Sequence, residues 1–139
     1  MKSKSQIIVR YAETDQMGIV HHANYPIWYE VARTDFIKQL GITYTEMENM
    51  GLLLPLLELQ SRYLDAARYE DELTVEAALQ SISRVKLEFA YVIYRAGEYK
   101  PINKGRTMHG IVDKNLRPLN LQKVHPELYQ KFLDAVELI

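Results

Sequence analysis

A polar segment near the N-terminus carries the side chains best suited to chemistry. It lies between the apolar run QIIVRY (residues 6–11) and a helical pattern that starts near Asn24, and it contains Glu13, Thr14, Asp15, Gln16, Gly18, His21 and His22. A loop that leads into a helix offers unpaired backbone N–H groups and the positive end of the helix dipole. Such groups stabilise an oxyanion, and a nearby carboxylate can act as nucleophile or as general base on water. Asp15 is therefore a candidate for acyl-transfer chemistry.

The same residue types also have a purely structural explanation. Asp, Thr, Asn and Gly turn the chain and cap helices in most loops, and from loop composition alone this explanation is the more common one. A metal site at His21 and His22 is disfavoured, because adjacent side chains diverge and no spaced set of partner ligands is evident. The chain has no cysteine, no G-x-S-x-G motif and no glycine-rich phosphate loop, which argues against the common alternative catalytic templates.

Length and composition limit the possible classes of protein. The chain of 139 residues fits one domain, residues 1–139, with 47% apolar and 25% charged residues. A net charge of -1 argues against nucleic acid as a partner and against a polybasic membrane-surface protein. No segment reaches the roughly 18 apolar residues of a membrane span, and no signal-peptide pattern is present. We expect a soluble, cytoplasmic protein.

Two helices are predicted in the first half of the chain. From Asn24 onward Trp28, Ala32, Phe36 and Leu40 recur every four residues, which is one face of an amphipathic helix. Asn24 is its expected N-cap, Pro26 lies in its first turn, and Gly41 follows its end. Its apolar residues spread over a wide arc, so we expect it to be largely buried. A second, short helix is predicted from a capping box at residues 45–48, closed by Gly51.

Four longer strands and a terminal helix complete the predicted order, in addition to a first strand at residues 6–11. Alternation of apolar and polar residues predicts strands near 57–63, 73–80, 85–93 and 105–113, each with one buried face. Helical spacing returns between residues 126 and 139. This order predicts an α+β protein whose curved antiparallel sheet wraps around one long central helix.

The loop also carries a family resemblance. Tyr11-x-Glu13-Thr14-Asp15-x-x-Gly18-x-Val20-x-His22-x-x-Tyr25, followed by Glu30 and Arg33, closely resembles the signature of the 4-hydroxybenzoyl-CoA thioesterase family. The nearest branch is the Tol-Pal-associated short-chain acyl-CoA thioesterases. The resemblance implies the hotdog fold and hydrolysis of an acyl-CoA to the free acid and coenzyme A.

By position in the motif, the resemblance assigns roles to several residues. Asp15 matches the catalytic aspartate, which attacks the thioester carbonyl or activates water. His22 lies where the family's oxyanion-binding N–H is found. Gly18 would let the loop approach the substrate. Tyr11 and Tyr25 would line the same region, although core packing explains each of them equally well.

The resemblance also implies partners and substrate contacts. A homodimer, often paired into a tetramer, is expected, and coenzyme A is part of the substrate rather than a separate cofactor. Arg84 and Lys86 would contact its phosphates, although basic residues on strands commonly just face solvent. Thr107 and His109 resemble a family G-x-T-x-H stretch without an assigned step.

The sequence leaves both the activity and the substrate open to alternatives. A hydratase or dehydratase on the same fold is one alternative, and a non-catalytic domain that binds acyl-CoA or acyl carrier protein is another. The acyl group, and the choice between coenzyme A and acyl carrier protein as its carrier, are not determined by the sequence.

Overall fold

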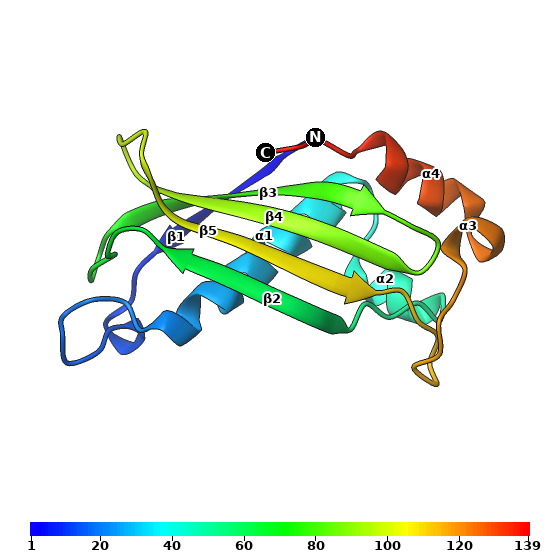
Figure 1. Ribbon diagram of the computed structural model, residues 1–139, viewed down its shortest axis with the longest axis horizontal. Coiled ribbons are helices and arrows are strands. Elements are labelled where there is room, and N and C mark those ends of the chain that lie inside the picture. The colour runs from blue at the N-terminus through cyan, green and yellow to red at the C-terminus, as the bar shows by residue number, and fades with distance from the viewer.

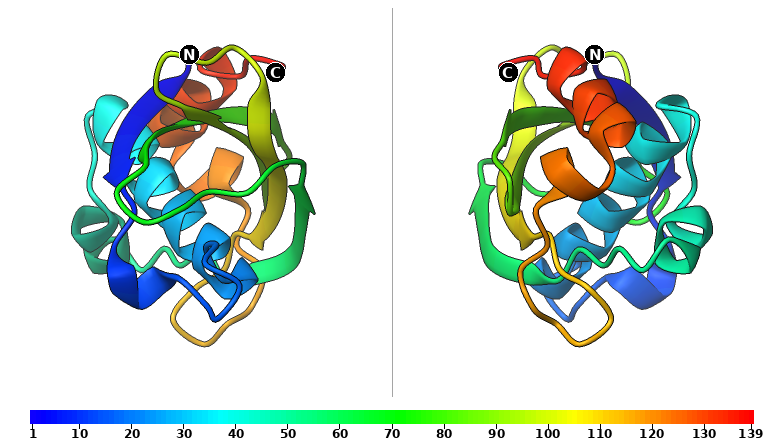
Figure 2. Two further views of the ribbon diagram at one scale, coloured as in Figure 1. Left: turned by 90° about the vertical axis from the view of Figure 1, so that its left-hand side faces the viewer. Right: turned by 90° about the vertical axis from the view of Figure 1, so that its right-hand side faces the viewer.

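One curved sheet and a long helix define the architecture (Figure 1). The computed structural model describes residues 1–139. The strands are β1 (Ser3–Ile8), β2 (Leu56–Tyr63), β3 (Glu72–Ile82), β4 (Lys86–Arg95) and β5 (Pro101–Gly110). They pair antiparallel in the order β1-β3-β4-β5-β2, which leaves β1 and β2 as the two edges. The end-on views in Figure 2 show the sheet curving around α1 (Tyr25–Gln39), as the sequence pattern predicted.

The long helix buries the face that its periodicity marks. Its buried residues include Trp28, Ala32 and Phe36, and the Phe36 ring meets Phe89 of β4 edge to face at a centroid distance of 5.3 Å. Gly41 follows the helix with φ +91°, which a residue without Cβ adopts at little cost.

The opposite side of α1 is open, so the expectation of a largely buried helix is wrong for the single chain. Ile27 and Val31 are 52% and 39% exposed. The sheet covers α1 from one side only, and these two side chains lie on the other side.

The first strand begins and ends earlier than predicted. It spans Ser3–Ile8 rather than residues 6–11, and Tyr11 instead starts a short 3₁₀ turn. Ser3 and Ser5 are buried because their hydroxyls find partners on α1: Ser3 donates to the Ala32 carbonyl at 3.0 Å, and Ser5 donates to the Asp35 carboxylate. Because of these long-range partners, the residues form a strand, although their local sequence resembles a polar tail.

The second strand is an edge strand without a buried face. β2 pairs only with β5, and every residue in it is exposed except half-buried Ser61. The predicted burial of its alternate residues is therefore wrong in the single chain, where Leu57 and Leu59 remain exposed. β5 begins at Pro101 instead of residue 105 and ends at Gly110. Proline is tolerated at the first position of a strand. The turn before β5 is therefore shorter than the sequence predicted.

The short helix α2 (Tyr44–Asn49) is capped by a different threonine from the one predicted. The Thr43 hydroxyl accepts from the Glu46 N–H at 3.1 Å, so the predicted capping box that starts at Thr45 is wrong. Gly51 follows this helix with φ +79°, as predicted.

Two helices close the far end of the chain. α3 (Leu121–Val124) leads into α4 (Pro126–Asp134), which buries Leu128 and Phe132. The predicted terminal helix is thus present but ends at Asp134, short of Ile139. No helix is both long enough and apolar enough to cross a membrane.

Candidate active site

The loop between β1 and α1 folds back on itself and holds Asp15 near its tip. The Asp15 N–H donates to the Ile19 carbonyl at 2.9 Å, and the Gly18 N–H donates to the Asp15 carbonyl at 3.0 Å. Gly18 has φ +77°, so this tight turn requires glycine. Oδ1 of half-buried Asp15 accepts from the Met17 N–H at 2.8 Å. The other carboxylate oxygen has no hydrogen-bond partner in the chain and remains available.

Glu13 anchors this loop to the helix, a role that sequence reasoning missed. The residue is only 4% exposed. Oε1 accepts from the Arg10 N–H at 2.8 Å, and Oε2 accepts from Trp28 Nε1 at 2.9 Å. Its backbone carbonyl accepts from the His21 N–H and from Asn24 Nδ2. Glu13 belongs to the motif, but only its burial shows that its carboxylate holds the loop in place.

The start of α1 lacks the side-chain cap that was predicted. Asn24 occupies the cap position, but its Nδ2 donates back to the carbonyls of Glu13 and His21 instead of its Oδ1 accepting from the helix. A 3₁₀ turn at His22–Asn24 precedes the helix, and His21 Nδ1 accepts from the Ala23 N–H at 3.2 Å. The side-chain capping role expected for Asn24 is therefore wrong.

The backbone N–H of His22 is free at this helix start. It donates to no acceptor in the chain, whereas the His22 carbonyl accepts from the Tyr63 hydroxyl at 3.2 Å. The exposed His22 ring lies against the His21 ring at a centroid distance of 4.1 Å. A free N–H beside a helix N-terminus can donate to an anionic oxygen, and the helix dipole adds to this attraction.

The two tyrosines of the motif occupy different environments. Tyr25 is buried, and its ring meets Trp28 and Tyr63 edge to face at 5.0 and 5.1 Å. Burial raises the pKa of Tyr25, so its hydroxyl stays protonated at neutral pH. Tyr11 is 75% exposed, and its ring meets the Tyr69 ring edge to face at 5.6 Å. Tyr25 thus packs in the core beside the loop, and Tyr11 lies on the surface.

Arg84 and Lys86 lie far from Asp15 within one chain. Arg84 lies in the turn between β3 and β4, and Lys86 is the first residue of β4, at the end of the sheet opposite the β1–α1 loop (Figure 1). Arg95, at the other end of β4, donates to the Ala66 carbonyl. The next residue, Ala67, accepts from the Val20 N–H of the β1–α1 loop. The single chain therefore does not bring the two predicted phosphate contacts to the loop.

Thr107 and His109 belong to a buried polar chain beneath a groove between α1 and β2. The groove has a volume of about 590 Å³, and both residues line its floor together with Arg33 and Tyr44. The pKa of His109 is lowered to about 4, chiefly by burial and also by the nearby Arg33 charge. His109 is therefore neutral at pH 7.

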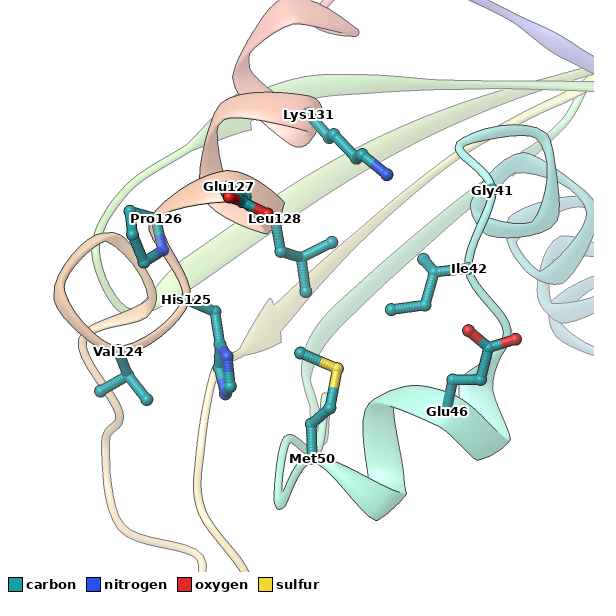
Figure 3. A pocket seen from close by; sticks show the side chains of 10 residues that line it. All are labelled: Gly41, Ile42, Glu46, Met50, Val124, His125, Pro126, Glu127, Leu128 and Lys131. Carbon is teal, nitrogen blue, oxygen red and sulfur yellow. The ribbon is translucent and has the colours of Figure 1, made fainter.

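A second cavity, of about 430 Å³, lies between α2 and α4 (Figure 3). Figure 3 shows His125 and Met50 on its walls, with Glu46 and Lys131 at its sides. None of the predicted site residues lines it. No group of three or more His, Cys, Asp or Glu side chains in the protein could hold a metal ion.

Comparison with known proteins places the chain in a family. The model of the thioesterase-like superfamily matches residues 9–132. The chain is 39% identical over 135 residues to the "Putative acyl-CoA thioesterase YneP" of Bacillus subtilis, with 96% of each chain covered. It is 32% identical over 88 residues to acyl-CoA thioesterase YbgC of Haemophilus influenzae, covering 63% of this chain and 65% of that one.

A solved structure agrees over nearly the whole chain. The DHNA-CoA thioesterase from Staphylococcus aureus superposes with a TM-score of 0.90 at 30% sequence identity, covering 96% of this chain and 89% of that one. The predicted hotdog fold and the predicted class of thioester hydrolase are confirmed, whereas the Tol-Pal-associated branch stays a prediction. The chain belongs to the thioesterase-like superfamily, the hotdog-fold enzymes that hydrolyse thioesters.

Proposed function

We propose that this protein is an acyl-CoA thioesterase that uses Asp15 as nucleophile or general base and the His22 N–H as oxyanion donor. The observation that carries the proposal is that the segment leading into α1 holds both an available carboxylate oxygen, on Asp15, and a free N–H, on His22. The names of the acyl-CoA thioesterases among its relatives support coenzyme A as the carrier.

In this mechanism the thioester carbonyl oxygen becomes negatively charged as its carbon is attacked. The His22 N–H and the helix dipole stabilise that charge, and losing one such donor typically costs about 2.7–4 kcal/mol. Collapse of the intermediate breaks the C–S bond and releases coenzyme A, whose sulfur takes up a proton. If Asp15 attacks, water then hydrolyses the acyl anhydride; if Asp15 is the base, water attacks directly.

The active unit is proposed to be at least a homodimer, with tetramer formation as an extension. The open side of α1 and the edge strand β2 carry exposed apolar side chains, among them Ile27, Val31 and Leu59. An apolar patch of this kind is a common protein interface. Assembly would also let Arg84 and Lys86 of a second subunit approach the site, which the single chain does not do. Either residue would then contact the coenzyme A phosphates.

The sharpest test is the Asp15→Asn substitution. The asparagine side chain keeps an oxygen that can accept from the Met17 N–H, so the loop should stay folded while the charge is lost. We expect turnover of the best acyl-CoA in a graded panel, followed by thiol release, to fall by about 10²–10⁴-fold. Asp113→Asn is the matched control, because Asp113 also accepts backbone N–H groups in a turn. Undiminished thiol release by Asp15→Asn would remove Asp15 from the mechanism.

The same panel separates the alternatives. A hydratase or dehydratase changes the acyl chain but releases no thiol, and a binding domain retains acyl-CoA without turnover. Parallel assays with acyl carrier protein substrates decide the carrier. In a single turnover in H₂¹⁸O with enzyme in excess, label in the Asp15 carboxylate would identify Asp15 as the nucleophile, since a general base cannot acquire the label.

A further inference from the structure

Arg33 on α1 is a cation without a carboxylate partner. Its Nε donates to the Tyr44 hydroxyl and its Nη1 donates to the Tyr91 hydroxyl, both at 3.0 Å. It forms none of the protein's ion pairs. Burial raises the pKa of both tyrosines, so both partners are neutral at pH 7. The guanidinium keeps its charge at pH 7, and no carboxylate of the chain forms an ion pair with it.

A directional chain of hydrogen bonds holds the guanidinium in place. The Leu54 carbonyl can only accept, so His109 donates to it from Nδ1 at 3.2 Å. Neutral His109 then accepts at Nε2 from the Thr107 hydroxyl at 2.9 Å. Because Thr107 has used its proton, it accepts from the Tyr91 hydroxyl at 2.6 Å. Tyr91 has likewise used its proton, so its oxygen is left to accept from Arg33.

The remaining guanidinium nitrogen is reachable from the groove between α1 and β2. Nη2 of Arg33 makes no hydrogen bond, yet no fully enclosed side-chain nitrogen or oxygen lacks a partner. Nη2 is therefore accessible, and Arg33 lines the groove of about 590 Å³. The other lining includes Ile27, Leu56 and Leu59. The groove thus combines apolar walls with one fixed, unused cationic donor, a combination that suits a chain ending in an anion.

We propose that Arg33 binds a carboxylate at the distal end of the acyl group, so that the preferred substrates are thioesters of dicarboxylic acids. The inference rests on the proposed thioesterase function and adds a substrate class to it. The acyl chain lies along the apolar walls, and the terminal carboxylate takes the donors that Arg33 leaves unused. The positions of Tyr44 and Tyr91 orient the guanidinium for this contact.

Two glutamates also line the groove and oppose this preference. Glu30 and Glu48 are exposed, and neither comes within ion-pair distance of Arg33. Their charges repel a second carboxylate through solvent, where salt screens the interaction. Removing the charge of Glu48 should therefore strengthen the preference for the carboxylate. This increase is a second expected effect, opposite in direction to the effect of removing Arg33.

The test compares matched substrates in the assembled enzyme. Each pair has the same number of carbons and differs only in its end: glutaryl-CoA with pentanoyl-CoA, adipoyl-CoA with hexanoyl-CoA, and suberoyl-CoA with octanoyl-CoA. The measured quantity is the ratio of kcat/KM within a pair, because a general loss of folding or catalysis cancels in it. In the wild-type protein we expect at least one pair to favour the carboxylate by about 10–100-fold.

Four variants decide the outcome. Arg33→Met should abolish the preference, Arg33→Lys should keep part of it, and Glu48→Gln should increase it. Thr34→Val removes another polar group from the groove and should leave the preference for the carboxylate unchanged. Equal ratios in the wild type and Arg33→Met, or a wild-type preference for the alkyl substrate in every pair, would overturn the inference while thioesterase function stands. No hydrolysis of any substrate would instead overturn the proposed function, and the inference with it.

Discussion

At the scale of single residues, two carboxylates of one loop have separate tasks. Every oxygen of the buried Glu13 side chain accepts from a fixed donor, Arg10 N or Trp28 Nε1. Such saturation stabilises the loop and leaves nothing for a substrate. Asp15 uses one oxygen for the Met17 N–H and keeps the other. The division between a structural acid and an available acid is what makes Asp15, not Glu13, the chemical candidate.

The buried His109 predicts a pH dependence of stability. Its pKa is lowered from 6.5 to about 4 in the folded protein, so the unfolded chain binds a proton at a higher pH than the native state does. The stability contributed by this group is therefore fully present above pH 6.5 and is lost as the pH falls from there through about 4, by up to about 3 kcal/mol.

Urea denaturation of the wild type between pH 7 and pH 4.5 measures this loss. His109→Gln should show a shallower decline over the same window, whatever its absolute stability, because the titrating group is gone. His125→Gln, which alters a half-buried histidine between α3 and α4, is the control. An identical decline in His109→Gln and the wild type would exclude His109 as the source.

At the scale of elements, the start of α1 is organised by contacts distant in sequence. Asn24 spends its side chain on the carbonyls of Glu13 and His21, and Tyr63 of β2 binds the His22 carbonyl. The His22 N–H, which precedes Asn24 in the chain, takes part in none of these contacts and stays free. A conventional Asn cap would accept from the helix itself and reduce its attraction for an anion.

The cap of α2 provides a direct comparison of two nearby threonines. Thr43→Ala removes the hydroxyl that accepts from the Glu46 N–H and should lower the free energy of unfolding by about 1 kcal/mol. Thr45→Ala changes an exposed helical residue and should stay within about 0.5 kcal/mol. Chemical denaturation measures both. A larger effect at Thr45 would mean that the helix begins where the sequence pattern placed it.

A close approach between β5 and α1 supplies a second prediction. A Cβ at Gly105 would overlap the ring of Tyr29, which is held by hydrogen bonds to Ser61 and Asn103. Gly105→Ala should therefore destabilise the protein by about 1–3 kcal/mol. Gly110→Ala on the same strand meets only ordinary contacts, the nearest at 3.7 Å, and should be much milder. Thermal denaturation would contradict this account if the two variants melted together.

At the scale of the whole molecule, the exposed apolar residues of β2 and α1 form the surface through which we propose that subunits assemble. Lysine at an edge strand opposes pairing with another chain. Leu59→Lys should therefore shift the protein toward the monomer in sedimentation velocity. Ile8→Lys places the same charge on the other edge strand, β1, at a residue that is also exposed, and should leave the assembly intact. A Leu59→Lys protein that stays fully assembled would rule out this interface.

Local sequence determined much of the fold. The four-residue spacing of Trp28, Ala32 and Phe36 predicted the face that α1 buries, and alternation predicted the strands from β2 to β5 to within a few residues. The positions of Gly41 and Gly51 after their helices followed from the same local chemistry. These features depend on neighbours in the chain, so periodicity and turn residues suffice to predict them.

The motif from Tyr11 to Tyr25 likewise identified the loop and the family, but not which of its residues are buried. Only the tertiary structure decided that Glu13 is enclosed, that Ser3 and Ser5 belong to a strand, and that β2 is an edge. It also separated Arg84 and Lys86 from the loop and gathered Arg33, Tyr91 and His109 into one hydrogen-bonded chain. The physical reason is that burial and hydrogen-bond partners come from residues far apart in sequence, whose approach is set by strand order and sheet curvature rather than by local pattern.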